Sequence, residues 1–187
     1  PVTFSVVEGP AVLLPGNQLR FTGYGTARVE AAQAGNANWL AAPPVTNAYT
    51  VVPAPNLTHY VALAGQTSIW PYASWEQAAT TLQDAADAAW DGDAIEVAAG
   101  VYDQGGRAAP GFDLVNRICL TRTVAVVSVD GPEVTVIAGQ PGVDAGLGAG
   151  AMRCAYLTNG ATLTGFTLRD GATRAGGDLF QDRSGGA

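Results

Sequence analysis

The sequence has few charged residues, a single histidine and no lysine. Charged side chains make up 13% of the chain, all nine basic residues are arginine, and the formal net charge is −7. Such a chain has no basic surface with which to neutralise phosphates, so we expect it to bind neither nucleic acid nor anionic lipid head groups. No apolar run approaches the roughly 18 residues of a membrane helix, so we expect no membrane insertion.

Cysteine and histidine are too scarce to support several common kinds of site. Two cysteines, Cys119 and Cys154, are too few for a disulfide scaffold, and their spacing does not fit a metal site. We expect both to be buried as small apolar side chains rather than paired. His59 has no cysteine or carboxylate near it in the sequence, so we expect it at the surface or at a strand edge. The Gly-x-Ser-x-Gly motif of serine hydrolases is absent.

What the chain does contain predicts a mainly β fold. Hydrophobic residues make up 48% of the sequence, and 24 glycines and 11 prolines divide them into short runs rich in Val, Leu and Thr. Turn signals separate four expected strands, which together would form one small sheet layer. These strands are residues 2–7, 18–22, 26–31 and 49–52.

The first part of the chain resembles a known module of bacterial surface proteins. The segments PVTFSVVEGPAVL (residues 1–13) and LRFTGYGTARVEAAQAGNANWLAAPPVTNAYTV (residues 19–51) are similar to the second half of an immunoglobulin-like repeat. The resemblance implies a partial immunoglobulin-like β module over residues 1–52, within a longer polypeptide that is secreted or displayed on a bacterial cell surface. Residues 53–58, with two prolines, are expected to be an extended linker.

One amphipathic helix is expected after the linker. Ser74 followed by Gln77 matches the capping-box pattern, and apolar residues then recur at helical spacing as far as Trp90. Asp91-Gly92 would end this helix. On it, Trp75 and Trp90 occupy positions that face the core.

Residues 59–187 resemble the start of a pectate-lyase-like right-handed parallel β-helix. The helix is followed at once by GDAIEVAAGVY (residues 92–102), which is similar to the N-terminal cap and first turn of that family. Two later segments, residues 119–131 and 156–171, share a Leu-Thr start and an Asp-Gly end, as expected of solenoid turns. They place Leu120 and Leu157 37 residues apart, and Asp130 and Asp170 40 residues apart, at equivalent positions of the repeat. Residues 134–138 would supply a third strand, and residues 140–150 a glycine-rich loop.

Proteins of that family bind and cleave polysaccharides, with aspartate-bound calcium and a basic residue in the lyases and paired aspartates in the hydrolases. The residues here that could take these roles are Asp170, Asp178 and Arg174 for catalysis, and Asp91 and Asp93 for a metal ion. Asp91 and Asp93 are better explained as the helix stop and the turn after it. Trp70 and Tyr72, around Pro71, are the rings expected to be free for a sugar. We expect no cofactor, with calcium as the alternative.

These observations lead to three hypotheses about function. The first is a structural, adhesive or carbohydrate-binding module whose partner is a polysaccharide or a cell-surface glycan. The second is a polysaccharide lyase or glycoside hydrolase, which rests on analogy of fold alone. The third is a scaffold that self-associates through open β edges. The sequence favours a protein without enzymatic activity, because it has no convergent catalytic set.

Overall fold

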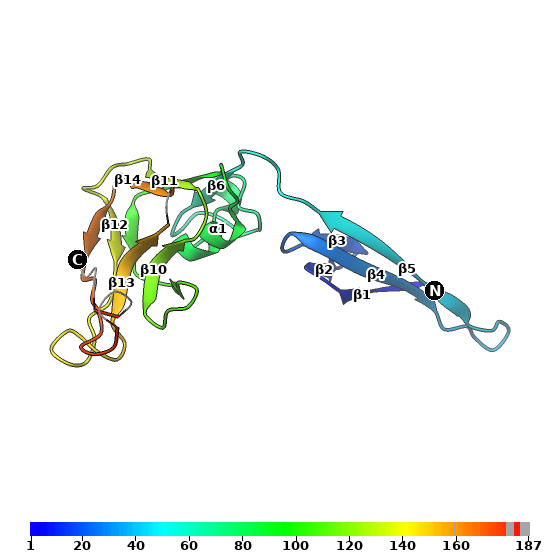
Figure 1. Cartoon of the computed structure of the whole chain (residues 1–187). Helices are drawn as coiled ribbons and strands as arrows, with labels where there is room; N and C mark the ends of the chain where they lie inside the picture. Colours follow the sequence, from blue (N-terminus) through cyan, green and yellow to red (C-terminus); the bar gives the residue numbers. More distant parts are fainter. Residues whose placement is uncertain (159, 179–181, 184–187) are drawn as a thin grey trace. The chain divides into compact units, whose positions relative to one another are not determined.

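A computed structural model describes residues 1–158, 160–178 and 182–183. The described chain is mainly β, as the sequence predicts, with one α-helix and one short 3₁₀ turn. It divides into two compact units, Pro1–Ala54 and Pro55–Ala187 (Figure 1). The boundary falls within the expected linker, and the first strand of the second unit, β6 (Thr58–Val61), begins at the last residue of that linker.

The first unit contains five strands in two sheets, so the expectation of four strands in one sheet was wrong. The antiparallel order β1-β4-β5 forms one sheet, and β2 pairs with β3 as a hairpin. The strands are β1 (Thr3–Glu8), β2 (Ala11–Leu14), β3 (Gln18–Phe21), β4 (Gly25–Gln33) and β5 (Ala42–Val51). Strand β2 was not predicted because AVLL is an unbroken apolar run without the alternation of apolar and polar residues that indicates a strand.

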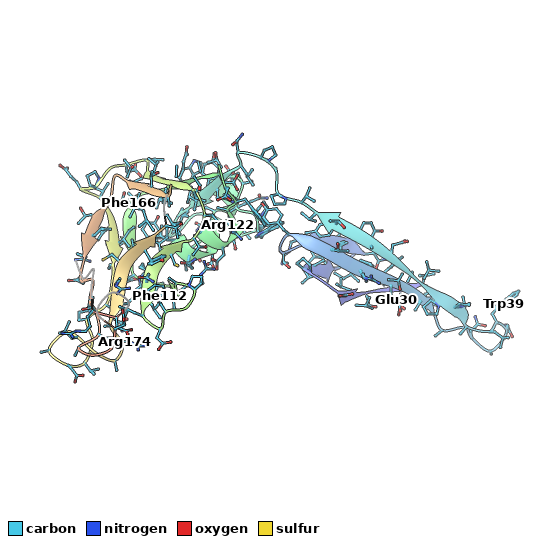
Figure 2. All side chains as sticks on the ribbon, viewed as in Figure 1. Glu30, Trp39, Phe112, Arg122, Phe166 and Arg174 are labelled. Carbon is cyan, nitrogen blue, oxygen red and sulfur yellow. The ribbon has the colours of Figure 1, made fainter. Side chains whose placement is uncertain are left out.

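Strand β5 begins seven residues earlier than expected. Pro43 and Pro44 indicated a turn, but both lie inside β5. Two adjacent prolines are tolerated there because β5 has a free edge that needs no amide donor and because the pairing with β4 shifts register opposite them, between Ala31 and Gln33. Between β4 and β5 the chain turns at Trp39, whose ring is exposed (Figure 2).

The second unit is built from parallel strand pairs in three sheets. One sheet has the order β14-β11-β7-β6, the second β15-β12-β8, and the third β13-β10-β9. All their pairings are parallel except that of β9 with β10. The remaining strands of these sheets are β7 (Ala94–Val97), β8 (Gly100–Tyr102), β9 (Arg107–Ala108), β10 (Val115–Leu120), β11 (Ala125–Ser128), β12 (Thr135–Ala138), β13 (Met152–Leu157), β14 (Thr162–Thr164) and β15 (Thr167–Arg169).

The chain visits these three sheets in a fixed order. It passes through β7, β8 and β10, then through β11, β12 and β13, so that each pass stacks on the one before it. Leu120 lies opposite Leu157 in the parallel pair of β10 and β13, which confirms the 37-residue repeat. Asp130 and Asp170 are not equivalent, however, because Asp130 follows β11 of the first sheet and Asp170 follows β15 of the second.

The helix is shorter than the sequence predicts. The α-helix α1 covers Leu82–Ala88, and its N-cap is Thr81, whose hydroxyl accepts a hydrogen bond from the Asp84 amide. Ser74 stands instead before the 3₁₀ turn η1 (Trp75–Gln77) and makes no side-chain cap bond. Thr81-Leu82-Gln83-Asp84 is therefore the functioning cap sequence, with Asp84 in the place usually held by Glu or Gln.

A main apolar core occupies the second unit, and a smaller separate cluster is formed by Leu114, Ala151 and Ala172. Ile95 lies opposite Val126, which in turn lies opposite Leu163, so that side chains of successive strands stack in register. The buried face of α1, including Leu82 and Ala85, packs against the same cluster. Each fully buried aliphatic side chain of this kind contributes about 1.5–3 kcal/mol through the hydrophobic effect.

Other predictions about buried residues had mixed outcomes. Cys119 and Cys154 are both buried and unpaired, as expected. Trp75 and Trp90 are not core residues, since they are 37% and 39% exposed. Trp75 packs on Tyr60 with 4.7 Å between ring centroids, and the Arg122 guanidinium lies 4.5 Å above the Trp90 ring.

Candidate functional site

His59 is not at the surface, so one of the two predicted positions was wrong; it lies in β6, the end strand of its sheet, as the strand-edge alternative has it. It has no exposed area, and its ring nitrogens contact the Pro71 carbonyl (Nδ1, 2.7 Å) and the Asp93 carboxylate (Nε2, 3.1 Å). Asp93 also accepts hydrogen bonds from the Leu57 and Trp90 amides. Because this carboxylate is 2% exposed and already has three partners, it holds together the segments around β6 and the end of α1.

Asp91, the other expected metal ligand, also has a structural partner. Its carboxylate accepts a hydrogen bond of 2.7 Å from the Thr123 amide, which belongs to the next pass of the chain. Among the residues that the structure describes, no three His, Cys, Asp or Glu side chains gather as metal ligands would.

Trp70 and Tyr72 are both partly buried, although the sequence analysis expected free rings. Tyr72 packs against the main core cluster, and burial raises its pKa, with further contributions from Asp84 and Asp87. Its backbone has φ of 67°, and its carbonyl accepts a hydrogen bond from the Tyr60 amide. Trp39, in the first unit, is 73% exposed and offers a much larger accessible ring face.

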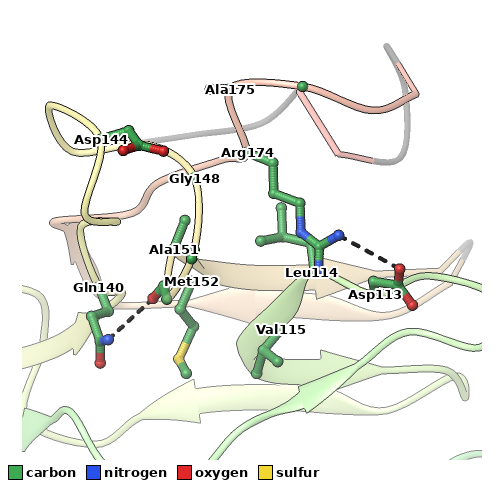
Figure 3. A pocket seen from close by; sticks show the side chains of 13 residues that line it. Asp113, Leu114, Val115, Gln140, Asp144, Gly148, Ala151, Met152, Arg174 and Ala175 are labelled. Atoms are coloured by element: carbon green, nitrogen blue, oxygen red, sulfur yellow. Dashed lines mark hydrogen bonds and ion pairs between the residues drawn. The ribbon is translucent and has the colours of Figure 1, made fainter.

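The larger cavity of the second unit, which we call the loop cavity, has a volume of about 570 Å³. Leu114, Val115 and Met152 supply apolar side chains, and the glycine-rich loop of residues 140–150 forms part of its wall (Figure 3). Arg174 lines the same cavity, with Nη1 3.5 Å from Asp113 Oδ2 and 3.8 Å from Asp182 Oδ1. The Arg174 charge is therefore already matched by two carboxylates.

A second cavity, which we call the strand-end groove, has a volume of about 390 Å³. Its polar side chains come from positions at or just after the ends of three neighbouring strands, β8, β12 and β15, together with one residue of β10. These polar residues are Asp103, Gln104, Arg117, Gln140, Arg169 and Asp170. Gln140 also lines the loop cavity, so the two cavities adjoin at this side chain.

Close backbone packing fixes the floor of the strand-end groove. A Cβ atom at Gly139 would lie 2.5 Å from the Met152 carbonyl oxygen and 2.6 Å from the Gly171 Cα. Only glycine fits at this point, where the end of β12 passes close to its neighbours.

Two aspartates of the groove have polar partners on their own strand ends. Asp103 accepts a hydrogen bond of 3.0 Å from the side-chain amide of Gln104 (Nε2), and Asp170 lies 3.6 Å from the Arg169 guanidinium. Asp170 adopts φ of 58°, the left-handed conformation typical of turn aspartates. The groove is therefore lined by both hydrogen-bond donors and hydrogen-bond acceptors.

Arg117 is the most unusual side chain of the groove. It is 3% exposed, and its guanidinium donates to the Ala138 carbonyl (Nε, 2.7 Å) and to the Gly105 carbonyl (Nη1). Burial lowers its pKa, while the nearby Asp103 carboxylate raises it. Arginine remains charged at neutral pH even so. No carboxylate of the described chain forms an ion pair with this buried cation, although four described salt bridges of the second unit involve three other arginines, Arg107, Arg169 and Arg174.

The predicted catalytic residues do not form one site. Asp170 lines the strand-end groove, whereas Arg174 lines the loop cavity. Asp178 contacts Asp182 through two bonds, since its amide donates to the Asp182 carboxylate and its carbonyl accepts from the Asp182 amide. Arg117 was not among the predicted site residues, although an arginine inside the mostly buried strand VNRICL is a signal that could have identified it.

Comparisons with known proteins identify no relative. Neither a protein-family model, nor a curated protein, nor a solved structure matches this chain. Among the described residues, no helix has the length and apolar character needed to span a membrane.

Proposed function

We propose that the second unit is the capped start of a right-handed parallel β-helix that binds glycans, in a bacterial protein that is secreted or displayed on the cell surface. Three parallel sheets visited in a fixed order support this fold, as does α1 packed against one end of the core. The first unit, with its two antiparallel sheets, would be an immunoglobulin-like module that carries the β-helix.

The observation that carries the glycan proposal is the pair of adjoining cavities that share Gln140. Sugars present many hydroxyl groups, each of which can both donate and accept a hydrogen bond. The strand-end groove offers amides, carboxylates and guanidinium groups, while the loop cavity adds an apolar surface for a ring face. A concave site with a few convergent polar groups is the usual form of a small-ligand site.

Retention on a panel of neutral and acidic polysaccharides, with and without calcium, tests this proposal. We expect the whole chain to bind at least one polymer, and Gln140→Ala to weaken that binding because it alters both cavities. Glu133→Ala is the matched control, since Glu133 is exposed and lies outside both cavities. Equal retention of the two variants, or no retention by the unmodified chain, would contradict the proposal.

A polysaccharide lyase or hydrolase is the second candidate function. The observation that favours it is that two carboxylates, Asp103 and Asp170, line the same groove, as two carboxylates do in most glycosidases. The same incubations, followed for new reducing or unsaturated ends, decide between the two functions. Cleavage that is lost in both Asp103→Asn and Asp170→Asn would establish the enzyme, whereas retention without cleavage supports the binding module.

Self-association of the chain is the remaining alternative. Exposed apolar side chains in the first unit include Phe4, Val45 and Tyr49, and these line a cavity of about 190 Å³ together with residues of the β2–β3 hairpin. Sedimentation velocity over a range of protein concentrations separates this case from glycan binding. A glycan-binding monomer keeps one sedimentation coefficient, while a scaffold shows a concentration-dependent increase.

A further inference from the structure

The tip of the hairpin that joins β4 to β5 exposes two large apolar side chains. Trp39 is 73% exposed and Leu40 is 94% exposed, and Figure 2 shows Trp39 at the outer end of the hairpin. Residues 31–58 include no Asp, Glu, Lys or Arg, so the tip carries no charge. Tryptophan is among the side chains that contribute most to protein interfaces, where a few large anchors supply most of the binding energy.

Hydrogen bonds hold this tip in one conformation before any contact forms. The side-chain oxygen of Asn36 accepts from the Asn38 amide at 2.8 Å and from the Trp39 amide at 3.0 Å. Asn36 and Trp39 also exchange two backbone hydrogen bonds. A Cβ atom at Gly35 would lie 2.5 Å from the Trp39 carbonyl oxygen, so only glycine allows this close turn. An anchor that is already ordered loses less conformational entropy on binding than a mobile loop does.

The same unit contains an apolar groove, which we call the hairpin groove, with a volume of about 190 Å³. Part of its lining comes from one face of the three-stranded sheet, where Phe4 lies opposite Ala31 and Ala31 opposite Val45. The β2–β3 hairpin supplies Leu13 and Leu19, which are paired with each other. Val45 is 60% exposed, so this apolar surface is in contact with water. An apolar side chain that entered the groove would remove both surfaces from water, which is favourable.

The hairpin groove matches the Trp39 tip in size and in polarity. An apolar cavity of about 150 Å³ accommodates a benzene ring, so the groove has room for an indole ring. Asn17 and Asn47 also line it, and their side-chain oxygens can accept the hydrogen bond that a buried indole N–H requires. Trp39 does not line the groove of its own chain. The groove is therefore available to the tip of another molecule.

The distribution of charge favours a second copy of the same chain as that molecule. The first unit contains two arginines and two glutamates and so has no net charge, which leaves the whole net charge of −7 on the second unit. Two copies repel each other through their second units but can meet through their first units without this repulsion. A reciprocal pair also buries two tips, while the cost in translational and rotational freedom arises only once.

We propose that two copies of the chain pair through their first units, with the Trp39–Leu40 tip of each copy bound in the hairpin groove of the other. Each copy uses both its tip and its groove, so the pair is closed and differs from a scaffold that grows along open β edges. An interface made by two such tips lies at the small end of the range for specific contacts, and we therefore expect a weak pair. The pairing involves the first unit alone and is independent of glycan binding by the second.

Sedimentation velocity of the whole chain without sugar, from micromolar to millimolar concentrations, tests this pairing. We expect the sedimentation coefficient to rise with concentration and to level off at the value of a dimer. Trp39→Ser removes the anchor and Val45→Arg places a charge in the groove, so each should weaken association at least about tenfold. Both side chains are exposed, so neither change disturbs a buried core. Val7→Ser is the control, because Val7 is an exposed apolar residue of β1 that does not line the groove.

A mixture of the two variants provides the sharper test. Trp39→Ser retains its groove and Val45→Arg retains its tip, so the mixture can form one of the two contacts and should associate more strongly than either variant alone. A mixture that associates no more strongly than the separate variants would overturn the proposal. A monomer at every concentration, growth beyond a dimer, or association as strong in Trp39→Ser or Val45→Arg as in Val7→Ser would also overturn it.

Discussion

His59 Nε2 lies 3.1 Å from Asp93 Oδ2, and neither side chain has more than 1% of its area exposed. The two residues are 34 positions apart, so this contact joins β6 to the turn after α1. The partners of the ring are a carbonyl oxygen and a carboxylate, and both of them accept. The pair thus stabilises the entry to the second unit.

Removal of either partner of this pair should destabilise the second unit. We expect His59→Ala to lower the free energy of unfolding by about 3 kcal/mol, because it removes the side-chain partner of a buried carboxylate, which keeps only its two backbone donors. Urea unfolding followed by tryptophan fluorescence measures this change. Glu133→Gln, on an exposed carboxylate, is the control. A His59→Ala midpoint equal to that of the control would show that the pair is not important for stability.

The position of the helix cap gives a second prediction. Thr81→Ala removes the hydroxyl that accepts from the Asp84 amide at 3.1 Å, and we expect a loss of about 1 kcal/mol. Ser74→Ala, at the position favoured by the sequence pattern, should change the stability much less, since Ser74 makes no side-chain cap bond. Thermal unfolding of the two variants compares these sites directly. The opposite ranking would place the functioning cap at Ser74.

Tyr102 predicts how stability depends on pH under alkaline conditions. Burial, with a contribution from Asp130, raises the pKa of Tyr102 to about 12, compared with about 10 in an unfolded chain. Between these pH values the unfolded state loses a proton that the folded state keeps, so this stabilising contribution is complete below pH ~10 and is lost as the pH rises to ~12.

The Tyr102→Phe variant isolates that contribution. In the unmodified chain the Tyr102 hydroxyl donates a hydrogen bond to the Ala98 carbonyl at 2.8 Å. The variant lacks this bond and should therefore be less stable at neutral pH. The slope of its stability between pH 10 and 11, measured by urea unfolding, should be shallower than that of the unmodified chain. Parallel slopes would indicate that Tyr102 ionises at its ordinary pKa. Tyr72, whose pKa is also raised, is present in both proteins and cancels in the comparison.

The two cysteines should be unreactive in the folded protein. Burial raises the pKa of both thiols, and only the thiolate form reacts with a disulfide reagent. We expect almost no reaction of Cys119 and Cys154 with Ellman's reagent under native conditions, and release of two equivalents after addition of denaturant. One fast-reacting thiol in the native protein would show that a cysteine is more accessible than the structure indicates.

Strand positions were predictable where apolar residues alternate or repeat. The 37-residue spacing of Leu120 and Leu157 correctly identified two side chains that lie opposite each other in a parallel pair. The identical Asp-Gly dipeptides at Asp130 and Asp170 were misleading. Tight turns favour this dipeptide after a strand of any sheet, so it does not show which sheet the preceding strand belongs to. Short motifs therefore identified turns but not their place in the stack.

The polar interior could not be predicted from local patterns. His59 and Asp93 form a pair only because parallel stacking brings distant segments together. The same is true of the strand-end groove, whose residues come from four strands or their ends. Of the expected site residues, Asp170 lies in that groove, while Asp91 and Asp93 have structural roles. Sequence patterns identify residues that are close together along the chain. These sites depend instead on contacts between segments that are far apart in the sequence.

The register of the parallel strands bears on how a protein of this kind can change in length. Ala94 lies opposite Ala125, so one pass of the chain here is 31 residues long, and Ile95 opposite Val126 keeps apolar faces aligned. A tandem duplication of one whole pass would present the same inner face to both neighbours. An insertion of a few residues within a strand would reverse or displace that face. Evolution could therefore lengthen the stack only in whole passes, while loops such as residues 140–150 remain free to vary in size and so to reshape the cavity they enclose.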